Sequence, residues 1–121
     1  EDELRALFAA DARGGDIRLH IGDAMEVVPN LPGQWDLVLL DADKRLYLEM
    51  LELVADRVPM GGIILADNTL WSSKVLADDA AHVDAQTRAL MRFNDAVAAD
   101  TRFQKVILPI RDGMTIMRRV R

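Results

Sequence analysis

The sequence predicts an α/β fold with a mostly parallel sheet. Helical and strand-like stretches alternate along its 121 residues. Two of the strand-like stretches, residues 36–40 and 61–66, are almost continuously apolar, as in strands that helices cover on both faces. An Asp-Gly pair near the C-terminus predicts a hairpin there, so the last two strands should be antiparallel.

A group of polar residues follows each apolar stretch. Asp41, Asp43 and Lys44 follow the first stretch, and Asp67 and Asn68 follow the second. Ligands of parallel α/β sheets bind outside the carboxyl ends of the strands. If the two strands are neighbours, these side chains converge on one point, which is the predicted active site.

The bulk composition excludes several classes of protein. Half of the residues are hydrophobic and 29% are charged, which is ordinary for a globular domain. The net charge of −5 and the scattered basic residues argue against nucleic-acid binding. The absence of cysteine excludes disulfides and thiolate chemistry. The apolar runs are far shorter than the roughly 20 residues that span a bilayer, and no signal-peptide pattern opens the chain, so we expect a cytoplasmic protein without a membrane partner.

The first third of the chain should contain two helices around one strand. Residues 1–13 have a helical apolar face, and residues 17–21 alternate in the manner of a strand. Asp23, with Glu26 three positions later, resembles a capping box that opens a short helix. Pro29 and Pro32 lie at the expected end of that helix.

The remaining elements follow the same alternation. An apolar stripe predicts a helix over residues 46–58, residues 72–82 have the character of a loop, and residues 84–99 again have helical periodicity. Residues 103–110 and 114–120 are the strands of the predicted hairpin, with Arg111, Asp112 and Gly113 in the turn.

An ordered set of motifs resembles the cation-dependent O-methyltransferases that use S-adenosylmethionine, typified by catechol and caffeoyl-CoA O-methyltransferases. The motifs are Asp41-Ala42-Asp43-Lys44 with Tyr47, Gly61-Gly62 before Asp67-Asn68-Thr69-Leu70-Trp71, Arg92-Phe93-Asn94, and Leu108-Pro109-Ile110-Arg111-Asp112-Gly113. The resemblance covers nearly the whole chain. It implies a Rossmann-like methyltransferase fold and methyl transfer from S-adenosylmethionine to a hydroxyl of a small, catechol-like aromatic acceptor.

The family's Gly-rich first strand does not precede these motifs in the sequence. We therefore expect a single partial domain over residues 1–121, equivalent to the C-terminal half to two-thirds of a methyltransferase and lacking its first two strands. Such a fragment should be inactive alone and should bind the cofactor weakly. It should either pair residues 17–21 beside residues 36–40 or cover that sheet edge with a second copy, so we expect a homodimer.

The resemblance implies a divalent cation on Asp41, Asp67 and Asn68. Two carboxylates and one amide oxygen suit Mg²⁺ best, with Ca²⁺ or Mn²⁺ also possible. A bound dication would lower the pKa of a hydroxyl coordinated to it. The alternative is that these strand-end residues only cap the turns that follow them.

The other site residues are also implied by the resemblance. Lys44 is the general base and Asp41 the second catalytic residue, and Asp41, Asp43 and Tyr47 contact the cofactor, with Asp43 at its amino group. Lys44 could instead be a solvated lysine, and Tyr47 a core residue. Trp71 should border the acceptor pocket, or merely pack.

The segment Gly22, Asp23 and Ala24 matches the family's contact with the adenine of the cofactor. Asp23 is equally well explained as a helix N-cap, and both roles are compatible.

Two other functions remain open. One is a non-catalytic or partner-requiring methyltransferase fragment. The other is phosphoryl transfer, because Asp41 and Asp43 after a buried strand would also suit an aspartyl nucleophile. That class favours a small or hydroxylated residue soon after the second aspartate, and Lys44 and Arg45 fit this poorly.

Overall fold

The computed structural model describes residues 1–78 and 82–121. These residues form two compact units, Glu1–Leu31 and Pro32–Arg121. The expectation of a single domain over residues 1–121 stays a prediction. No helix among the described residues is both long enough and apolar enough to cross a membrane.

The first unit is built of short helical segments. They are α1 (Asp2–Ala10), η1 (Gly14–Asp16), α2 (Ala24–Val27) and η2 (Val28–Asn30). The strand predicted over residues 17–21 is wrong, and so is its pairing beside residues 36–40, because no strand is formed there. The alternation of Ile17, Leu19 and Ile21 indicates a segment that could be half-buried, but a strand also needs a hydrogen-bonding partner. Ile17 and Ile21 are exposed instead.

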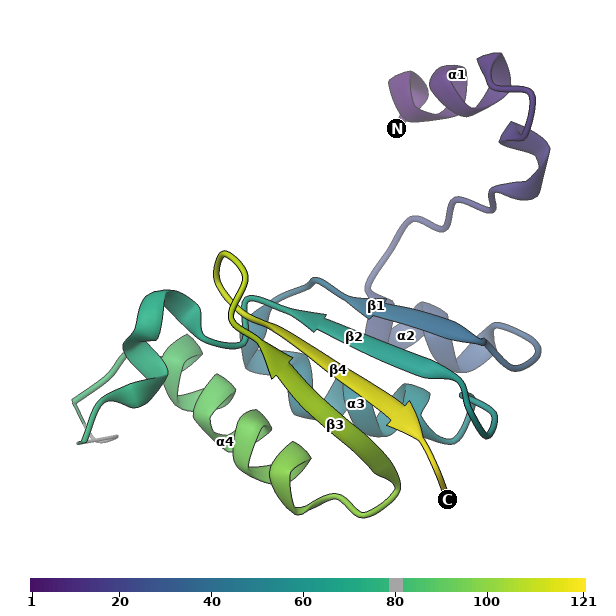
Figure 1. Ribbon diagram of the computed structural model, residues 1–121. Coiled ribbons are helices and arrows are strands. Elements are labelled where there is room, and N and C mark those ends of the chain that lie inside the picture. The colour runs from purple at the N-terminus through teal and green to yellow at the C-terminus, as the bar shows by residue number, and fades with distance from the viewer. Residues whose placement is uncertain (79–81) are drawn as a thin grey trace. The chain divides into compact units, whose positions relative to one another are not determined.

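The second unit contains the sheet (Figure 1). Its elements are β1 (Leu37–Leu40), η3 (Lys44–Leu46), α3 (Tyr47–Ala55), β2 (Ile63–Asp67), η4 (Trp71–Leu76), α4 (Ala85–Ala99), β3 (Phe103–Leu108) and β4 (Met114–Arg119). The predicted helices and strands of this unit all occur and are shorter than predicted, and β2 begins and ends later than expected. In the predicted loop over residues 72–82, the first part is helical (η4) and residues 79–81 lie outside the described part of the chain.

The four strands form a mixed sheet in the order β1-β2-β4-β3. β1 and β2 are parallel, whereas β4 is antiparallel to both of its neighbours, so three strands run one way and β4 the other. The predicted hairpin is confirmed. Its turn places Arg111 and Gly113 at φ of 50° and 84°, where glycine is favoured and arginine is strained.

One face of the sheet packs against α3 and α4; in Figure 1, α3 passes behind the strands and α4 lies beside β3. Leu40 of β1 and Ile64 of β2 are buried on this face. Tyr47 and Phe93 meet edge to face at the centre of the core, with ring centroids 5.4 Å apart. The other buried apolar side chains are Met50, Leu51, Val54, Ala55, Val58, Ala66, Ala89, Leu90, Val97, Phe103 and Met117.

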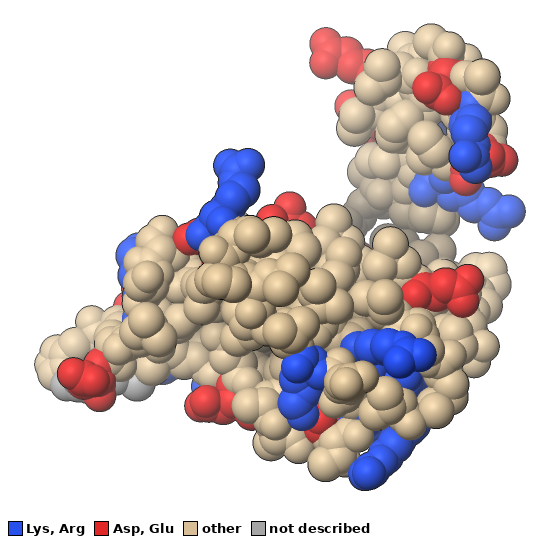
Figure 2. Space-filling model, viewed as in Figure 1, with Lys and Arg blue, Asp and Glu red and all other residues tan. Residues whose placement is uncertain are grey.

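The opposite face of the sheet is apolar, and no helix among the described residues of this unit covers it. Leu37 and Leu39 are 61% and 59% exposed, and Val106 is 51% exposed. The view in Figure 2, which looks onto this face, shows a broad area with few charged side chains.

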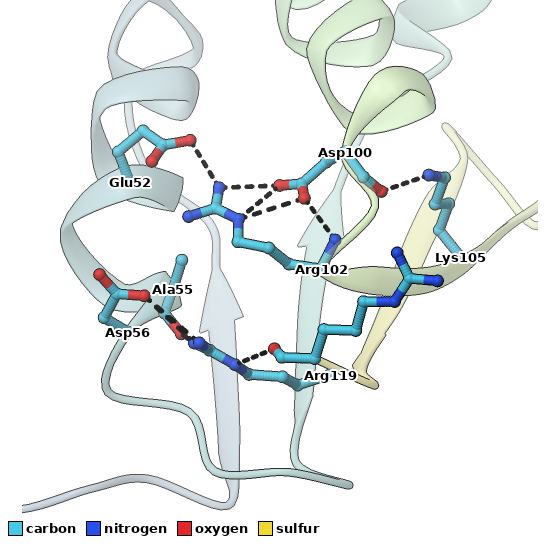
Figure 3. Close-up of polar contacts among 8 residues, drawn as sticks. Glu52, Ala55, Asp56, Asp100, Arg102, Lys105 and Arg119 are labelled. Atoms are coloured by element: carbon cyan, nitrogen blue, oxygen red, sulfur yellow. Dashed lines mark hydrogen bonds and ion pairs between the residues drawn. The ribbon is translucent and has the colours of Figure 1, made fainter.

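A polar network joins the helices to the hairpin at the end of the sheet opposite to the carboxyl ends of β1 and β2 (Figure 3). Arg102 donates to Asp100 and to Glu52 of α3, with both ion pairs at 2.8 Å. Arg119 of β4 donates to the carbonyl of Ala55. Burial opposes ionisation of Asp100, but the hydrogen bonds from Arg102 hold the pKa of its carboxyl below the ordinary value. The network fixes α3 and the α4–β3 connection to the sheet.

Candidate active site

The parallel register of β1 and β2 brings the predicted site residues to one edge. Leu40 pairs with Ala66, so Asp41 and Asp67 follow at the same level on neighbouring strands. Asn68 comes next and has a φ of 61°, in the left-handed region that asparagine tolerates better than most residues. Its backbone N–H donates to Asp67 Oδ1 at 2.7 Å. Asp41, Asp67 and Asn68 are therefore neighbours at the carboxyl ends of the strands.

Lys44 is held inside this edge. Lys44 is only 6% exposed, so the alternative interpretation of a solvated lysine is wrong. Its Nζ donates to Asp41 Oδ1 at 3.2 Å and to the hydroxyl of Tyr47 at 2.5 Å. The ammonium also lies 4.5 Å from the centre of the Tyr47 ring, within the range of a cation–π contact. A buried ammonium with these partners is rigidly placed.

Tyr47 connects the two strands to the start of α3. Its hydroxyl lies 3.1 Å from the carbonyl oxygen of Leu40 and 3.0 Å from that of Asp67, and it shares its one proton between them. Burial raises the pKa of the Tyr47 phenol, although the ammonium of Lys44 opposes this. The phenol is therefore neutral, accepting from Lys44 and donating to the strand ends. Tyr47 is a core residue, as one interpretation expected, and its contact with a cofactor stays a prediction.

Asp43 lies at the start of η3 and caps it. Its Oδ1 accepts from the backbone N–H of Arg45 at 3.0 Å, and its carboxylate forms an ion pair with the guanidinium of Arg45. The side-chain hydrogen bonds from Arg45, followed by this backbone bond, lower the pKa of Asp43 to about 2. Asp43 thus remains ionised at neutral pH, as a partner for a cationic amino group must be.

The residues present fit a hard divalent cation by their chemistry. The carboxylates of Asp41 and Asp67 and the side-chain oxygen of Asn68 are the oxygen donors that Mg²⁺, Ca²⁺ and Mn²⁺ prefer. Among the described residues, no three His, Cys, Asp or Glu side chains are grouped closely enough to hold a metal. A cation site here would depend on the amide of Asn68 as its third protein ligand.

A cavity of about 540 Å³ opens beside Asp67 and Asn68. Its other lining residues, which the sequence motifs did not single out as a site, are Ser72, Arg111 and Asp112. The turn of the hairpin brings Arg111 and Asp112 there, and Ser72 comes from η4, which follows β2. Arg111 and Asp112 belong to the last of the family-like motifs, and the Asp-Gly pair predicts their turn but not what the turn contacts, whereas no motif includes Ser72.

Hydrogen bonds attach the hairpin turn to the segment after β2. The carbonyl of Asp112 accepts from Leu70 N–H at 2.9 Å, and that of Gly113 accepts from Thr69 N–H at 3.1 Å. Oδ1 of Asp112 accepts from the backbone N–H of Ser72 at 2.6 Å. The wall of the cavity is therefore a fixed turn.

Trp71 lines a different, neighbouring pocket of about 410 Å³, together with Arg45 and Lys74. It has a φ of 49°, and its indole Nε1 is buried without a hydrogen-bond partner among the described residues. Trp71 thus directly precedes Ser72, which lines the first cavity, but Trp71 itself does not line that cavity. Its contact with an acceptor stays a prediction.

The segment Gly22, Asp23 and Ala24 belongs to the first unit. Asp23 is the N-cap of α2, and its Oδ1 accepts from the N–H of Met25 at 2.8 Å. This confirms that Asp23 caps the helix. Its side chain accepts from the backbone N–H of Met25, the second helical residue, rather than from that of Glu26. The contact of the segment with adenine stays a prediction.

Comparisons with known proteins agree with these motifs. The model of the O-methyltransferase family matches residues 7–120. A caffeoyl-CoA O-methyltransferase of Medicago sativa is 38% identical over 93 residues, covering 74% of this chain and 38% of the relative. The caffeoyl-CoA O-methyltransferase 1 of Zea mays is 41% identical over 97 residues, covering 74% of this chain and 36% of the relative. The chain thus spans less than two-fifths of the length of these relatives.

Solved structures share the fold. The methyltransferase PaMTH1 of Podospora anserina, solved with SAH, has a TM-score of 0.82 and 25% identity, covering 99% of this chain and 55% of its own. The O-methyltransferase TomG of Streptomyces achromogenes, solved with SAM, has a TM-score of 0.88 and 19% identity, covering 99% of this chain and 57% of its own. The Rossmann-like methyltransferase fold is thereby confirmed, and the chain belongs to the O-methyltransferase family.

Proposed function

We propose that the protein to which these residues belong transfers a methyl group from S-adenosylmethionine to a hydroxyl of a small catechol-like acceptor, with the help of a divalent cation. The observation that carries the proposal is the meeting of Asp41, Asp67 and Asn68 at neighbouring strand ends. The buried Lys44 beside them supports it.

The names of the relatives supply the reaction class. Caffeoyl-CoA O-methyltransferases are enzymes that methylate oxygen, and two structural neighbours were solved with SAM or SAH. When bound, S-adenosylmethionine would supply an electrophilic methyl group, and the cation would lower the pKa of the acceptor hydroxyl. Asp41, Asp67 and Asn68 would hold the cation, and Asp43 would receive the amino group of the cofactor.

Lys44 is the group placed to move a proton. Its Nζ contacts Asp41, one of the proposed cation ligands, so a hydroxyl held near Asp41 would lie within reach of it. Tyr47 accepts a hydrogen bond from the same Nζ and fixes its position through the carbonyls of Leu40 and Asp67. A lysine can act as a base only in its neutral form. A nearby cation would favour that form by repelling the charged one.

A second possibility is a partner-requiring role for these residues. The exposed apolar sheet face, with Leu37, Leu39 and Val106, favours it, since soluble proteins rarely leave large apolar patches uncovered. A homodimer is one such arrangement. Light scattering of the full-length protein measures this directly, and a monomer would exclude the homodimer.

The function is tested by a methyl-transfer assay on the full-length protein. We would incubate it with methyl-labelled S-adenosylmethionine and a panel of catechols and non-catechol phenols, after chelator treatment and after adding back Mg²⁺, Mn²⁺ or Ca²⁺. Labelled catechol ether that forms only with added cation supports the proposal. Full activity in chelator contradicts the role of the cation, and no transfer to any catechol contradicts the acceptor class.

A further inference from the structure

We infer that Arg111 selects acceptors that carry a negatively charged carboxylate. This rests on the proposed function, because it assigns an acceptor to the cavity beside Asp67 and Asn68. Arg111 lines this cavity and is the only basic residue among the described residues of its lining.

The guanidinium of Arg111 has no partner within the described chain. It makes neither a hydrogen bond nor an ion pair there, although Asp67 and Asp112 line the same cavity. Oxygens of both carboxylates are already engaged: Oδ1 of Asp67 accepts from Asn68, and Oδ1 of Asp112 accepts from Ser72. The N–H donors of Arg111 remain available, and their planar fork matches a carboxylate in two parallel hydrogen bonds.

The position of Arg111 is fixed and strained. It lies in the turn that is hydrogen-bonded to residues 69–72, and its φ is 50°, a conformation that glycine adopts more easily. An arginine here therefore carries a conformational cost that a glycine would avoid. Strain of this kind on a residue that lines a cavity is a reason to look for a role in binding.

The charges of the cavity define what Arg111 would do. Without it, the lining residues would present only the negative charges of Asp67 and Asp112, and an anionic acceptor would be repelled. With it, the cavity has a cationic group as well as the proposed cation ligands Asp67 and Asn68. A small aromatic ring fits a volume of about 540 Å³, so a dihydroxylated aromatic acid could place its hydroxyls near Asp67 and its carboxylate on Arg111.

The test compares 3,4-dihydroxybenzoate with its neutral analogue 3,4-dihydroxybenzyl alcohol on the full-length protein. Three variants are needed: Arg111→Gln, Arg111→Gly and the control Arg118→Gln. Arg118 is an exposed residue of β4 near the other end of that strand, so its substitution changes the net charge equally. Arg111→Gly relieves the backbone strain and keeps the test valid if the glutamine variant folds poorly.

Both Arg111 variants should lower kcat/KM for 3,4-dihydroxybenzoate about tenfold or more, by raising KM. Their kcat/KM for the alcohol should stay within about twofold of the wild-type value. Arg118→Gln should change neither. Calorimetric titration of the acid, with Mg²⁺ and without S-adenosylmethionine, should show the same loss of affinity. Equal binding of the acid by wild type and the Arg111 variants overturns the inference, as does an equal loss in Arg118→Gln. If the protein methylates neither compound, the proposed function fails, while the titration still decides the role of Arg111.

Discussion

Lys44 Nζ lies 3.2 Å from Asp41 Oδ1, and the two side chains differ sharply in exposure. The lysine side chain is 8% exposed and the aspartate side chain 61%. The ammonium is thus fixed from the protein side, while the carboxylate stays open to a ligand. This arrangement suits a lysine that must contact a substrate without a change of position.

Replacing Lys44 tests its role as a base. Lys44→Ala should lower kcat by about 10²- to 10⁴-fold, the usual contribution of a general base, and change the affinity for S-adenosylmethionine much less. Lys44→Arg separates proton transfer from charge, because arginine stays protonated. It should be as impaired as the alanine variant. An arginine variant with near wild-type kcat would show that Lys44 supplies only charge.

Tyr47→Phe should destabilise the fold by about 1–3 kcal/mol, because the carbonyls of Leu40 and Asp67 and the ammonium of Lys44 lose a buried partner. Urea unfolding of both proteins measures this difference. The ring and its contact with Phe93 are kept, so packing should not contribute. Equal midpoints would mean that water replaces the hydroxyl at no cost.

Gly113 should be intolerant of a side chain. A Cβ at this position would lie 2.4 Å from Leu70 Cγ, and its φ is 84°. Gly33 is the matched control, since its φ is 86° and no atom lies within 4 Å of its Cβ position. Gly113→Ala should therefore cost about 1–3 kcal/mol more than Gly33→Ala in urea unfolding. Equal costs would show that backbone strain alone matters and that Leu70 yields.

The low pKa of Asp43 predicts acid sensitivity. Its pKa is lowered from 3.8 to about 2 in the folded protein, so folding favours the ionised form. The stability from its hydrogen bonds with Arg45 is then present above pH 3.8 and is lost as the pH falls toward 2. Asp43→Asn should lose stability less steeply than wild type between these pH values. Parallel pH profiles for the two proteins would contradict this.

The sequence predicted the sheet of the second unit because its signals are local. The apolar runs before Asp41 and Asp67, and the Asp-Gly turn at residue 113, define strands and hairpin without knowledge of distant contacts. The strand predicted over residues 17–21 is absent for the complementary reason. Alternation describes how a strand would be buried, but strand formation depends on a partner, and the described residues provide none.

The site was predictable only in part. Asp41, Asp67 and Asn68 follow from the rule that ligands bind at strand ends. Arg111 and Ser72 were not predicted as cavity residues, because hydrogen bonds between segments about 40 residues apart bring them there. The helical turns of η4 were also missed. Ser72 and Ser73 have positive φ, which serine seldom adopts, so no local pattern indicates them.

Binding of Mn²⁺, followed by electron paramagnetic resonance, tests the proposed cation site most directly. The full-length protein should bind one Mn²⁺ per chain, and Asp41→Ala and Asp67→Ala should each weaken this binding at least about tenfold. Asp95→Ala, which removes an exposed carboxylate from α4, should leave it unchanged. Absence of binding by wild type, or equal binding by wild type and the Asp41 and Asp67 variants, would contradict a cation at the ends of β1 and β2.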